Sequence, residues 1–328
     1  MYLLDKIQNL VTAQIVPGVS YAYLNHQQIT KGTKGVNTWQ PQITALSSNP
    51  LYDLASLTKV IGTTTVLLHL IEQEKLSYDT PIKQWLPTFC DSRVTLRHLM
   101  THTSGIQGYI PHRDHLNASE LVQALLQLPV TSDFEKVIKY TDTGLILAGL
   151  IIEKIYELPV QTVIEQVVLH PLDLKSATFS PIKDNCVVTT TRRGRHLQGI
   201  VQDPKAQQLG KHCGSAGLFA SLDDLIRFSQ FMLGQLTIPA APLKRNTIKN
   251  LYQSFTKIEP GRSFGWDLKW NQNQEPVLYH TGYTGNFIAL DWQQQRGLIV
   301  LSNRVHPYND NQRFLAARQA IMELFLQN

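Results

Sequence analysis

Ser56 and Lys59 are the first residues along the chain whose types and spacing could perform covalent chemistry. Side chains three positions apart share one face of a helix, so the hydroxyl and the ammonium can meet. A serine hydroxyl is a weak nucleophile until a base takes its proton, and a lysine can be that base if its pKa is lowered. Ser-x-x-Lys also recurs by chance, with a surface serine and a solvated lysine as the alternative.

Tyr140 and Asp142 form a second group, directly before an apolar segment that is typical of a helix. A tyrosine beside a lysine can act as the base toward serine and then protonate the leaving group. Asp142 can hold Lys59 by a charge-assisted hydrogen bond. The alternative is structural: Asp142 caps the helix and Tyr140 packs beneath it.

The third group is His280-Thr281-Gly282, flanked by apolar, strand-like residues. Edge-strand backbone here could donate an N–H to an oxyanion, and Gly282 would permit close approach. A simple turn is the alternative.

These three groups, in this order, resemble the motifs Ser-x-x-Lys, Tyr-x-Asn and Lys/His-Thr-Gly of the serine β-lactamase and penicillin-binding protein superfamily, in particular its class C β-lactamase-like members. The similarity extends from about Val16 to the C-terminus. Segments that look like family segments are 53–59, 95–105, 145–154, 171–179, 215–225 and 280–285.

The resemblance implies a role for each residue. Ser56 would form an acyl-enzyme, and Lys59 and Tyr140 would handle its proton. The backbone N–H groups of Ser56 and Tyr283 would form the oxyanion hole, and Thr281 would contact the substrate. No cofactor is implied.

Two positions depart from the family pattern. Asp142 replaces the usual Asn, which favours a protonated Lys59 and moves the role of base toward Tyr140. His280 replaces the Lys that is commonest in β-lactamases, so a fixed charge near the substrate becomes a titratable one. We therefore expect carboxylate recognition to be weaker or pH-dependent, and β-lactam hydrolysis to be side chemistry at best.

Segments 201–206, 215–219 and 302–307 resemble a subgroup tied to cell-wall recycling, whose members act as amidases or peptidases on muropeptide fragments. Gln202 replaces the usual His of the first segment. Arg304 could bind a substrate carboxylate or form a structural ion pair. The predicted function is a serine hydrolase that acts on an amide or ester bond of a cell-wall-derived peptide or muropeptide. Alternatives are a β-lactamase, a short-chain carboxylesterase and a non-catalytic muropeptide-binding module.

A metal site is a further alternative, raised by two histidines. His98 and His102 are four positions apart, which can place two ligands on one helix face, but no glutamate lies between them as a general base. Cys90, Cys186 and Cys213 show neither disulfide nor metal-site spacing. We expect no metal.

Composition excludes other classes. The 328 residues are 43% hydrophobic and 17% charged, with a net charge of +5, as in a globular protein. The densest basic run, Arg192, Arg193 and Arg195, lacks the aromatic residues of a nucleic-acid site. No apolar run reaches the length of a membrane span. Without a signal-peptide pattern at Met1 we expect a cytoplasmic protein; removal of a leader would leave an extracellular location open. The sequence does not indicate an oligomeric state.

The elements that must position these residues follow from periodicity. We expect a hairpin first, helices in the middle, and strands and a helix last. This order predicts an α+β fold, an antiparallel sheet flanked by helices, with 1–75 and 210–328 forming a sheet domain and 76–209 a mostly helical insertion. The expected strands are 18–24, 29–35, 287–292 and 298–302, and the expected helices are 56–74, 96–100, 118–128, 144–156, 160–169, 222–232, 247–252 and 314–326.

Overall fold

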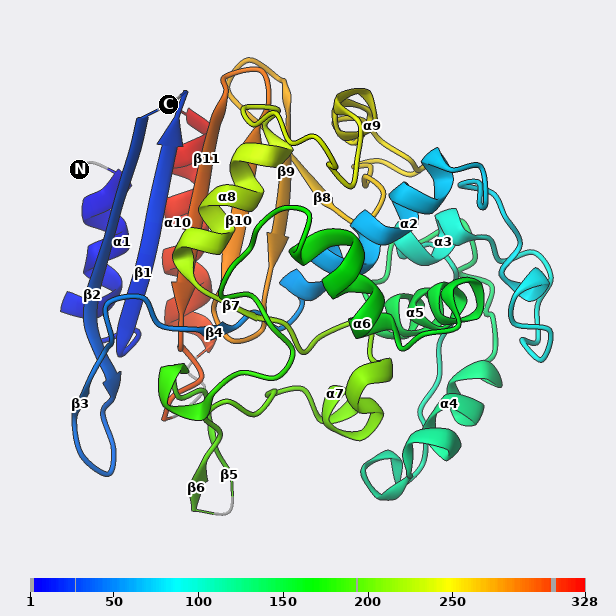
Figure 1. Ribbon diagram of the computed structural model, residues 1–328, viewed down its shortest axis with the longest axis horizontal. Helices are drawn as coiled ribbons and strands as arrows, with labels where there is room; N and C mark the ends of the chain where they lie inside the picture. The colour runs from blue at the N-terminus through cyan, green and yellow to red at the C-terminus, as the bar shows by residue number, and fades with distance from the viewer. Residues whose placement is uncertain (1–2, 27, 193, 308–310, 328) are drawn as a thin grey trace.

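The computed structural model describes residues 3–26, 28–192, 194–307 and 311–327. Within them, strands from both ends of the chain form one antiparallel sheet, and the helices from the middle of the chain lie beside it (Figure 1). The order of this sheet is β3 (Thr44–Ala45), β2 (Gln28–Thr38), β1 (Gly18–Asn25), β11 (Arg296–Ser302), β10 (Phe287–Asp291), β9 (Pro276–Thr281) and β8 (Asp267–Trp270). Smaller pairs are β4 (Tyr52–Asp53) with β7 (Phe219–Ala220), and β5 (Thr191–Arg192) with β6 (Arg195–His196).

The helices are distributed as follows. The α-helices are α1 (Leu3–Thr12), α2 (Thr64–Glu72), α3 (Leu96–Met100), α4 (Ala118–Leu126), α5 (Thr143–Tyr156), α6 (Val160–Ile164), α7 (Pro204–Leu209), α8 (Leu222–Met232), α9 (Arg245–Asn250) and α10 (Asn311–Gln327). Two π-helices, η1 (Lys59–Thr63) and η4 (Glu165–Leu169), adjoin α2 and α6. Single 3₁₀ turns are η2 (Ile82–Gln84), η3 (Arg113–His115), η5 (Lys183–Asn185) and η6 (Gly210–His212).

The sheet is apolar on both faces because each face is covered by helices. In β1, Val19 and Tyr21 pack in a cluster with α1 and α10, whereas Ala22 and Leu24 belong to the large cluster on the opposite face. Alternating side chains of a strand point to opposite faces, so this pattern makes the sheet the middle of three layers. Helix α8 crosses the second face in Figure 1.

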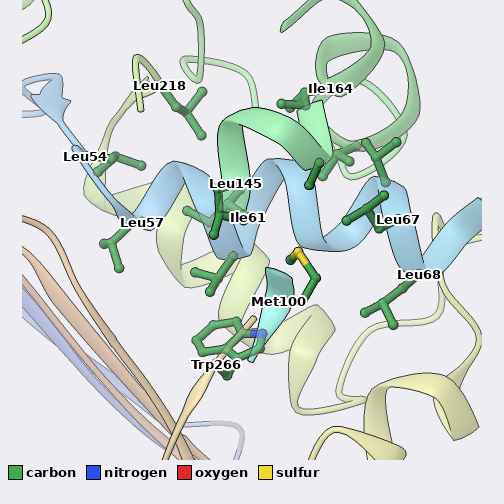
Figure 2. Close-up of a cluster of buried hydrophobic side chains, with 14 of the residues drawn as sticks. Leu54, Leu57, Ile61, Leu67, Leu68, Met100, Leu145, Ile164, Leu218 and Trp266 are labelled. Carbon is green, nitrogen blue, oxygen red and sulfur yellow. The ribbon is translucent and has the colours of Figure 1, made fainter. Parts of the chain in front are cut away.

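The helix that follows Ser56 runs through the centre of the large cluster (Figure 2). Leu57, Ile61 and Leu67 on this helix are at most 1% exposed, and they lie among Leu145 of α5 and Trp266. The segment is therefore held on all sides by apolar packing, which fixes the position of its N-terminal end.

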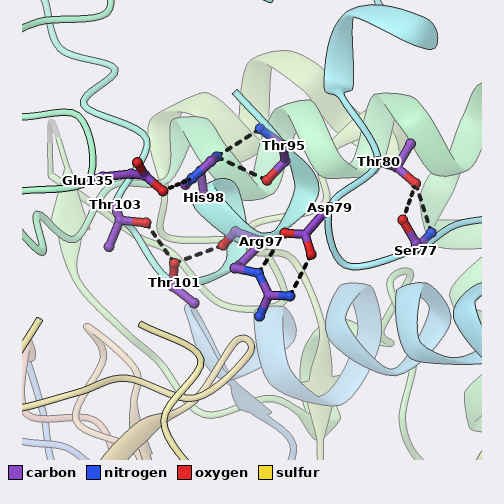
Figure 3. Close-up of polar contacts among 9 residues, drawn as sticks. All are labelled: Ser77, Asp79, Thr80, Thr95, Arg97, His98, Thr101, Thr103 and Glu135. Atoms are coloured by element: carbon purple, nitrogen blue, oxygen red, sulfur yellow. Dashed lines mark hydrogen bonds and ion pairs between the residues drawn. The ribbon is translucent and has the colours of Figure 1, made fainter. Parts of the chain in front are cut away.

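A polar network fixes the segment around α3 (Figure 3). Arg97 forms a bidentate pair with Asp79, with N–O distances of 2.7 and 2.8 Å. His98 contacts Thr95 through Nδ1 and Glu135 through Nε2, each at 3.0 Å. These contacts anchor the loop that carries His102, whose ring packs against Tyr140.

The structure confirms the predicted fold class and most elements. The 18–24 and 29–35 hairpin forms with Asn25 opposite Gln28, and α3 and α8 have their predicted bounds. Helical structure over the predicted 56–74 segment begins just after Ser56, and its first part is a π-helix. Helices α1 and α7 were not predicted; both are short and lie in segments where no element was expected.

One expectation about the sheet was wrong. The strand that carries His280, β9, is not an edge strand, because it pairs with β8 on one side and β10 on the other. The pairing with β8 ends at Tyr279, however, opposite Asp267. The last two residues of β9 therefore have a strand partner on one side only, among the residues that the structure describes.

The division into a sheet domain and a helical insertion stays a prediction. Helices α3 to α7 do lie within the predicted 76–209 insertion, and the strands of the large sheet lie outside it. The large apolar cluster nevertheless includes residues of both parts, such as Leu145 and Leu290. None of the described helices is both long and apolar enough to cross a membrane.

Leu67 tests how much the helix that follows Ser56 contributes to stability. Because Leu67 is fully buried, Leu67→Ala is expected to lower the free energy of unfolding by about 2–5 kcal/mol. Ile43, 72% exposed, provides the control, and Ile43→Ala is expected to change it by about 0.5 kcal/mol or less. Urea unfolding monitored by circular dichroism measures both, and equal losses of stability would contradict the assigned core.

Candidate active site

Ser56 lies in a tight turn between β4 and η1. The preceding residue, Ala55, has a φ of 47°, in the left-handed region that a residue with a side chain rarely adopts. Its N–H donates to Oδ1 of Asp53 at 2.9 Å, and Thr58 N–H returns to the Ala55 carbonyl at 3.1 Å. The turn is thus strained and held by specific hydrogen bonds, as is common at functional sites.

Asp53 connects this turn to two other segments. Its Oδ2 accepts the backbone N–H of Gln202 at 2.6 Å. Its main-chain carbonyl accepts from Thr284 Oγ1 at 2.7 Å and Asn286 Nδ2 at 2.8 Å. One residue therefore ties the turn that carries Ser56 to the loop before α7 and to the turn between β9 and β10.

Gly282 brings the end of β9 against the turn that carries Ser56. A Cβ at this position would lie 2.5 Å from the carbonyl oxygen of Leu54, which is closer than real Cβ contacts allow. The predicted close approach is therefore present. Ser56 and Tyr283, whose N–H groups were predicted to form the oxyanion hole, line the same cavity.

Lys59 is buried, with its side chain 1% exposed, and its ammonium has three oxygen neighbours. Nζ lies 2.7 Å from Ser56 Oγ, 2.8 Å from the Ser215 carbonyl oxygen and 2.8 Å from Asp142 Oδ1. Burial lowers the pKa of Lys59, but Asp142 and the nearby Tyr140 outweigh that effect and hold it above its usual range. The resting side chain is an ammonium that donates to Ser56.

Asp142 lies between two lysines. Its Oδ1 contacts Lys59 and its Oδ2 contacts Lys205 Nζ, each at 2.8 Å. Burial alone would raise the pKa of Asp142, but the two ammonium groups hold it well below its usual range. Although Asp142 stands at the N-terminus of α5, its side chain makes no capping hydrogen bond to that helix, so the structural alternative does not describe it.

Tyr140 lines the same cavity as Ser56 and is surrounded by basic side chains. Its ring centroid lies 4.6 Å from the ring of His102 and 6.0 Å from that of His280. Lys59 Nζ lies 5.5 Å from this centroid, and the Arg262 guanidinium 5.7 Å. The residue is 46% exposed, so its phenol can meet a substrate while its ring stays packed.

His280 differs from the expectation of a titratable charge facing the substrate. The imidazole is 3% exposed and does not line the cavity. Nδ1 lies 3.0 Å from the Thr281 carbonyl oxygen, so this nitrogen carries the proton of the neutral ring. Burial, Arg262 and Lys59 hold the pKa of His280 well below its usual range. The residue therefore stays neutral at physiological pH.

The cavity in front of Ser56 has a volume of about 480 Å³. Of the predicted site residues, Lys59 and His280 lie behind its wall, and the others line it: Ser56, Tyr140, Asp142, Thr281, Gly282, Tyr283 and Arg304. Residues with no predicted role complete the wall, notably Arg192, Gln202, Asp203 and Arg318.

Arg304, predicted either to bind a substrate carboxylate or to form a structural ion pair, packs against Tyr283. Its Nε donates to the Tyr283 carbonyl oxygen at 2.8 Å, and its guanidinium lies 5.1 Å from the ring centroids of both Tyr283 and Phe314. The side chain thus supports the predicted oxyanion residue from behind while also bordering the cavity.

His98 and His102 make separate contacts. His98 contacts Thr95 and Glu135, whereas His102 Nδ1 accepts the Thr141 N–H at 3.3 Å. In the described ranges, no group of three or more His, Cys, Asp or Glu side chains is arranged to hold a metal ion. Of the basic run, Arg192 and Arg195 belong to the β5–β6 hairpin, and Arg193 lies outside the described residues.

Asp53, Lys205 and Arg318 are parts of this site that the sequence did not predict. Asp142 in place of Asn was a usable signal for Lys205, because a second buried charge next to Lys59 needs a partner of its own. Arg318 carried no local signal, since α10 reaches the cavity only through the packing of the sheet.

Asp53 allows a test of the buried carboxylate. Burial raises its pKa to about 6, although the N–H groups of Ala55 and Gln202 oppose the rise and Asp203 adds to it. Because the folded pKa exceeds the unfolded value, the folded state binds the proton more tightly, and stability is lost as pH rises from about 4 through 6.

The free energy of unfolding of the wild type, minus that of Asp53→Asn, is therefore expected to fall by about 2–3 kcal/mol between pH 4 and pH 7. Urea unfolding of both proteins across this range measures it, and other titrating groups cancel in the difference. A difference that stays flat with pH would show that Asp53 is not held as the structure places it.

Known proteins resemble the chain over most of its length. The family model described as Beta-lactamase matches residues 3–321. The N-acetylmuramyl-L-alanine amidase of Bacillus subtilis (strain 168) is 25% identical, with 80% of this chain and 69% of that protein covered. A protein of Escherichia coli (strain K12), provisionally described as a D-alanyl-D-alanine carboxypeptidase, is 24% identical, with 81% and 72% covered.

Solved structures share the fold. A class C β-lactamase superposes with a TM-score of 0.81 at 18% identity, covering 99% of this chain and 94% of its own. A hydrolase with promiscuous acyltransferase activity superposes with a TM-score of 0.78 at 17% identity, covering 98% and 97%. The chain therefore belongs to the β-lactamase family and is a serine hydrolase of the serine β-lactamase and penicillin-binding protein superfamily.

Proposed function

We propose that the protein cleaves an amide bond of a small, anionic cell-wall peptide or muropeptide through an acyl-enzyme on Ser56. The observation that carries this proposal is the 2.7 Å contact between Lys59 Nζ and Ser56 Oγ at the wall of an open cavity. The names of the amidase and the carboxypeptidase among its relatives support an amide of cell-wall origin.

The chemistry follows from the positions of these groups. Ser56 Oγ attacks the substrate carbonyl, and its proton passes to the phenolate oxygen of Tyr140, because Lys59 is already an ammonium and has no lone pair to accept it. The N–H groups of Ser56 and Tyr283 stabilise the oxyanion. Collapse breaks the C–N bond, and the same proton goes to the leaving amine from Tyr140. Water then attacks the acyl-enzyme and releases the acid, with the proton transfers reversed.

Tyr140 is the better candidate for direct proton transfer in this scheme. The three ammonium protons of Lys59 are directed at Ser56, Ser215 and Asp142, and a protonated lysine accepts no proton. Tyr140 is exposed to the cavity, where it can reach both the nucleophile and the leaving group. Lys59 orients Ser56 Oγ and supplies positive charge beside it.

The cavity wall favours an anionic substrate. The side chain of Arg318 has no hydrogen-bond or ion-pair partner among the described residues. The side chain of Arg192 donates to the Gln202 carbonyl oxygen at 2.8 Å. The acidic groups of the wall are already neutralised, since Asp142 pairs with two lysines and Asp203 lies 3.5 Å from Lys205. The guanidinium groups of Arg318 and Arg192 have no acidic partner in the wall, and their geometry suits a carboxylate or phosphate of the substrate.

Labelling tests the nucleophile. A serine-reactive phosphonate is expected to add the mass of one adduct to the wild type, at Ser56, and none to Ser56→Ala, because no other serine has a buried ammonium at hydrogen-bond distance from its Oγ among the described residues. Intact-protein and peptide mass spectrometry measure the adduct. Ser92, which lies exposed in a surface turn, provides the control, and Ser92→Ala should be labelled like the wild type. Ser221 is unsuitable because its side chain caps α8.

The absence of an adduct from the wild type would favour the non-catalytic muropeptide-binding module. If the wild type is labelled, turnover assays with muramyl peptides, D-alanyl peptides, short-chain esters and a chromogenic cephalosporin distinguish the candidate activities. The proposal expects the highest kcat/KM with a carboxylate-bearing peptide amide. A preference for the esters or for the cephalosporin would favour the carboxylesterase or the β-lactamase instead.

Arg318 tests the substrate charge. Arg318→Gln is expected to raise KM about 10- to 100-fold for a carboxylate-bearing peptide, since a charge-assisted contact contributes about 1.5–3 kcal/mol. KM for a neutral ester should change little. Arg313→Gln, on the same helix but bonded to the Ala13 carbonyl oxygen, is the matched control. Equal effects of Arg318→Gln on both substrates would overturn the proposed carboxylate contact.

A further inference from the structure

Lys205 is a basic side chain in contact with the catalytic cluster that the mechanism above does not use. It lies on α7, far along the chain from Asp142, and its side chain is 16% exposed. Nζ lies 2.8 Å from Asp142 Oδ2 and 3.5 Å from Asp203 Oδ2. Together with Lys59 these groups form a row of alternating charge: Lys59, Asp142, Lys205 and Asp203.

We propose that Lys205 is a positioning residue for acyl transfer: it takes one oxygen of Asp142 and so prevents the full carboxylate charge from acting on Lys59. This inference rests on the proposed function, because it concerns the same acyl-enzyme chemistry.

At position 142 an Asp stands where the family pattern has Asn. An amide would give Lys59 an uncharged acceptor, whereas a buried carboxylate would bind the ammonium far more strongly. A tightly paired ammonium resists any movement of a proton along the Tyr140–Ser56 path. A second cation on the other oxygen weakens the hold of Asp142 on Lys59, because two ammonium groups now share one negative charge.

The geometry agrees with this division of charge. Lys59 contacts Oδ1 and Lys205 contacts Oδ2, and both distances are 2.8 Å. Asp142 makes these contacts while leaving its helix N-terminus uncapped. Lys205 does not line the cavity in front of Ser56; it borders a neighbouring cavity with Thr141 and Thr143. It therefore acts through Asp142 and not on the substrate.

Other charged or titratable groups near Lys59 do not replace Lys205 in this role. Tyr140 has its ring near Lys59, and His102, His280 and Arg262 pack around the same ring. Burial keeps both histidines neutral, because it holds their pKa values well below the usual range. In the part of the chain that the structure describes, neither histidine nor Arg262 forms an ion pair with Asp142, and Arg262 pairs with Asp267 at 3.4 Å.

Two single substitutions and their combination test the proposal. Lys205→Met leaves Asp142 to Lys59 alone. Asp142→Asn leaves Lys59 without a carboxylate and Lys205 with Asp203 only. Each is expected to slow the reaction of Ser56 with the phosphonate about 10- to 100-fold, because each removes buried charge–charge interactions of this row. Asp142→Asn combined with Lys205→Met removes one charge of each sign and is expected to recover most of the rate.

The pH profile of the reaction between Ser56 and the phosphonate provides a second readout. Lys205→Met is expected to move it to higher pH and Asp142→Asn to lower pH, each by about one unit, because the first removes a cation near Lys59 and the second an anion. The combined variant should return toward the wild type. Since Lys205 does not line the cavity in front of Ser56, we expect Lys205→Met to lower kcat for a peptide substrate and to leave KM unchanged.

Lys211→Met, at an exposed position shortly after α7, is the matched control, and it should react with the phosphonate at the wild-type rate. Thermal unfolding checks that each variant is folded. Rate reductions that add in the combined variant, or pH profiles that do not move in opposite directions, would overturn the role of Lys205 while leaving the proposed function intact. A wild type that the phosphonate does not label would remove both.

Discussion

The buried ammonium of Lys59 is the constraint on which the rest of the site depends. A charge with 1% of its side chain exposed is tolerated only when its hydrogen bonds are satisfied. Its three oxygen partners come from three segments: the nucleophile turn at Ser56, the loop at Ser215 and the start of α5 at Asp142. Satisfying one ammonium therefore fixes the relative positions of sheet-side and helix-side elements, and the same contacts orient the nucleophile.

Backbone geometry contributes as much as side-chain contacts to the position of the Ser56 hydroxyl. The left-handed Ala55 turns Ser56 toward the cavity, and Asp53 stabilises the turn while also holding the loop at Gln202. Gly282 lets the end of β9 approach the same turn to a distance that no side chain would permit. The strain is offset by the apolar packing of η1 and α2, most of whose residues are buried.

Local patterns predicted the elements well wherever packing and periodicity agreed. The alternation and aromatic content of β1 and the 3.6-residue periodicity of α8 specified both elements, although β1 is buried on both faces of the sheet. Short elements such as α7 were missed because six residues carry too little periodicity, although Asp203 and Pro204 are favourable at a helix N-terminus. The position of β9 inside the sheet was also missed, because the four residues of β8 are too few for their alternation to indicate a strand, and strand order is set by contacts between distant segments.

The sequence by itself determined the family and predicted Ser56, Lys59, Tyr140 and Asp142 as the residues that carry its chemistry, because motif spacing and residue type are local properties. Only the tertiary structure decided the charge environment of those residues. It buried His280 and kept it neutral, placed Lys205 against Asp142, and brought Arg318 of α10 to the cavity. The physical reason is that electrostatic energies depend on distance and burial, and both arise from packing between segments that lie far apart along the chain.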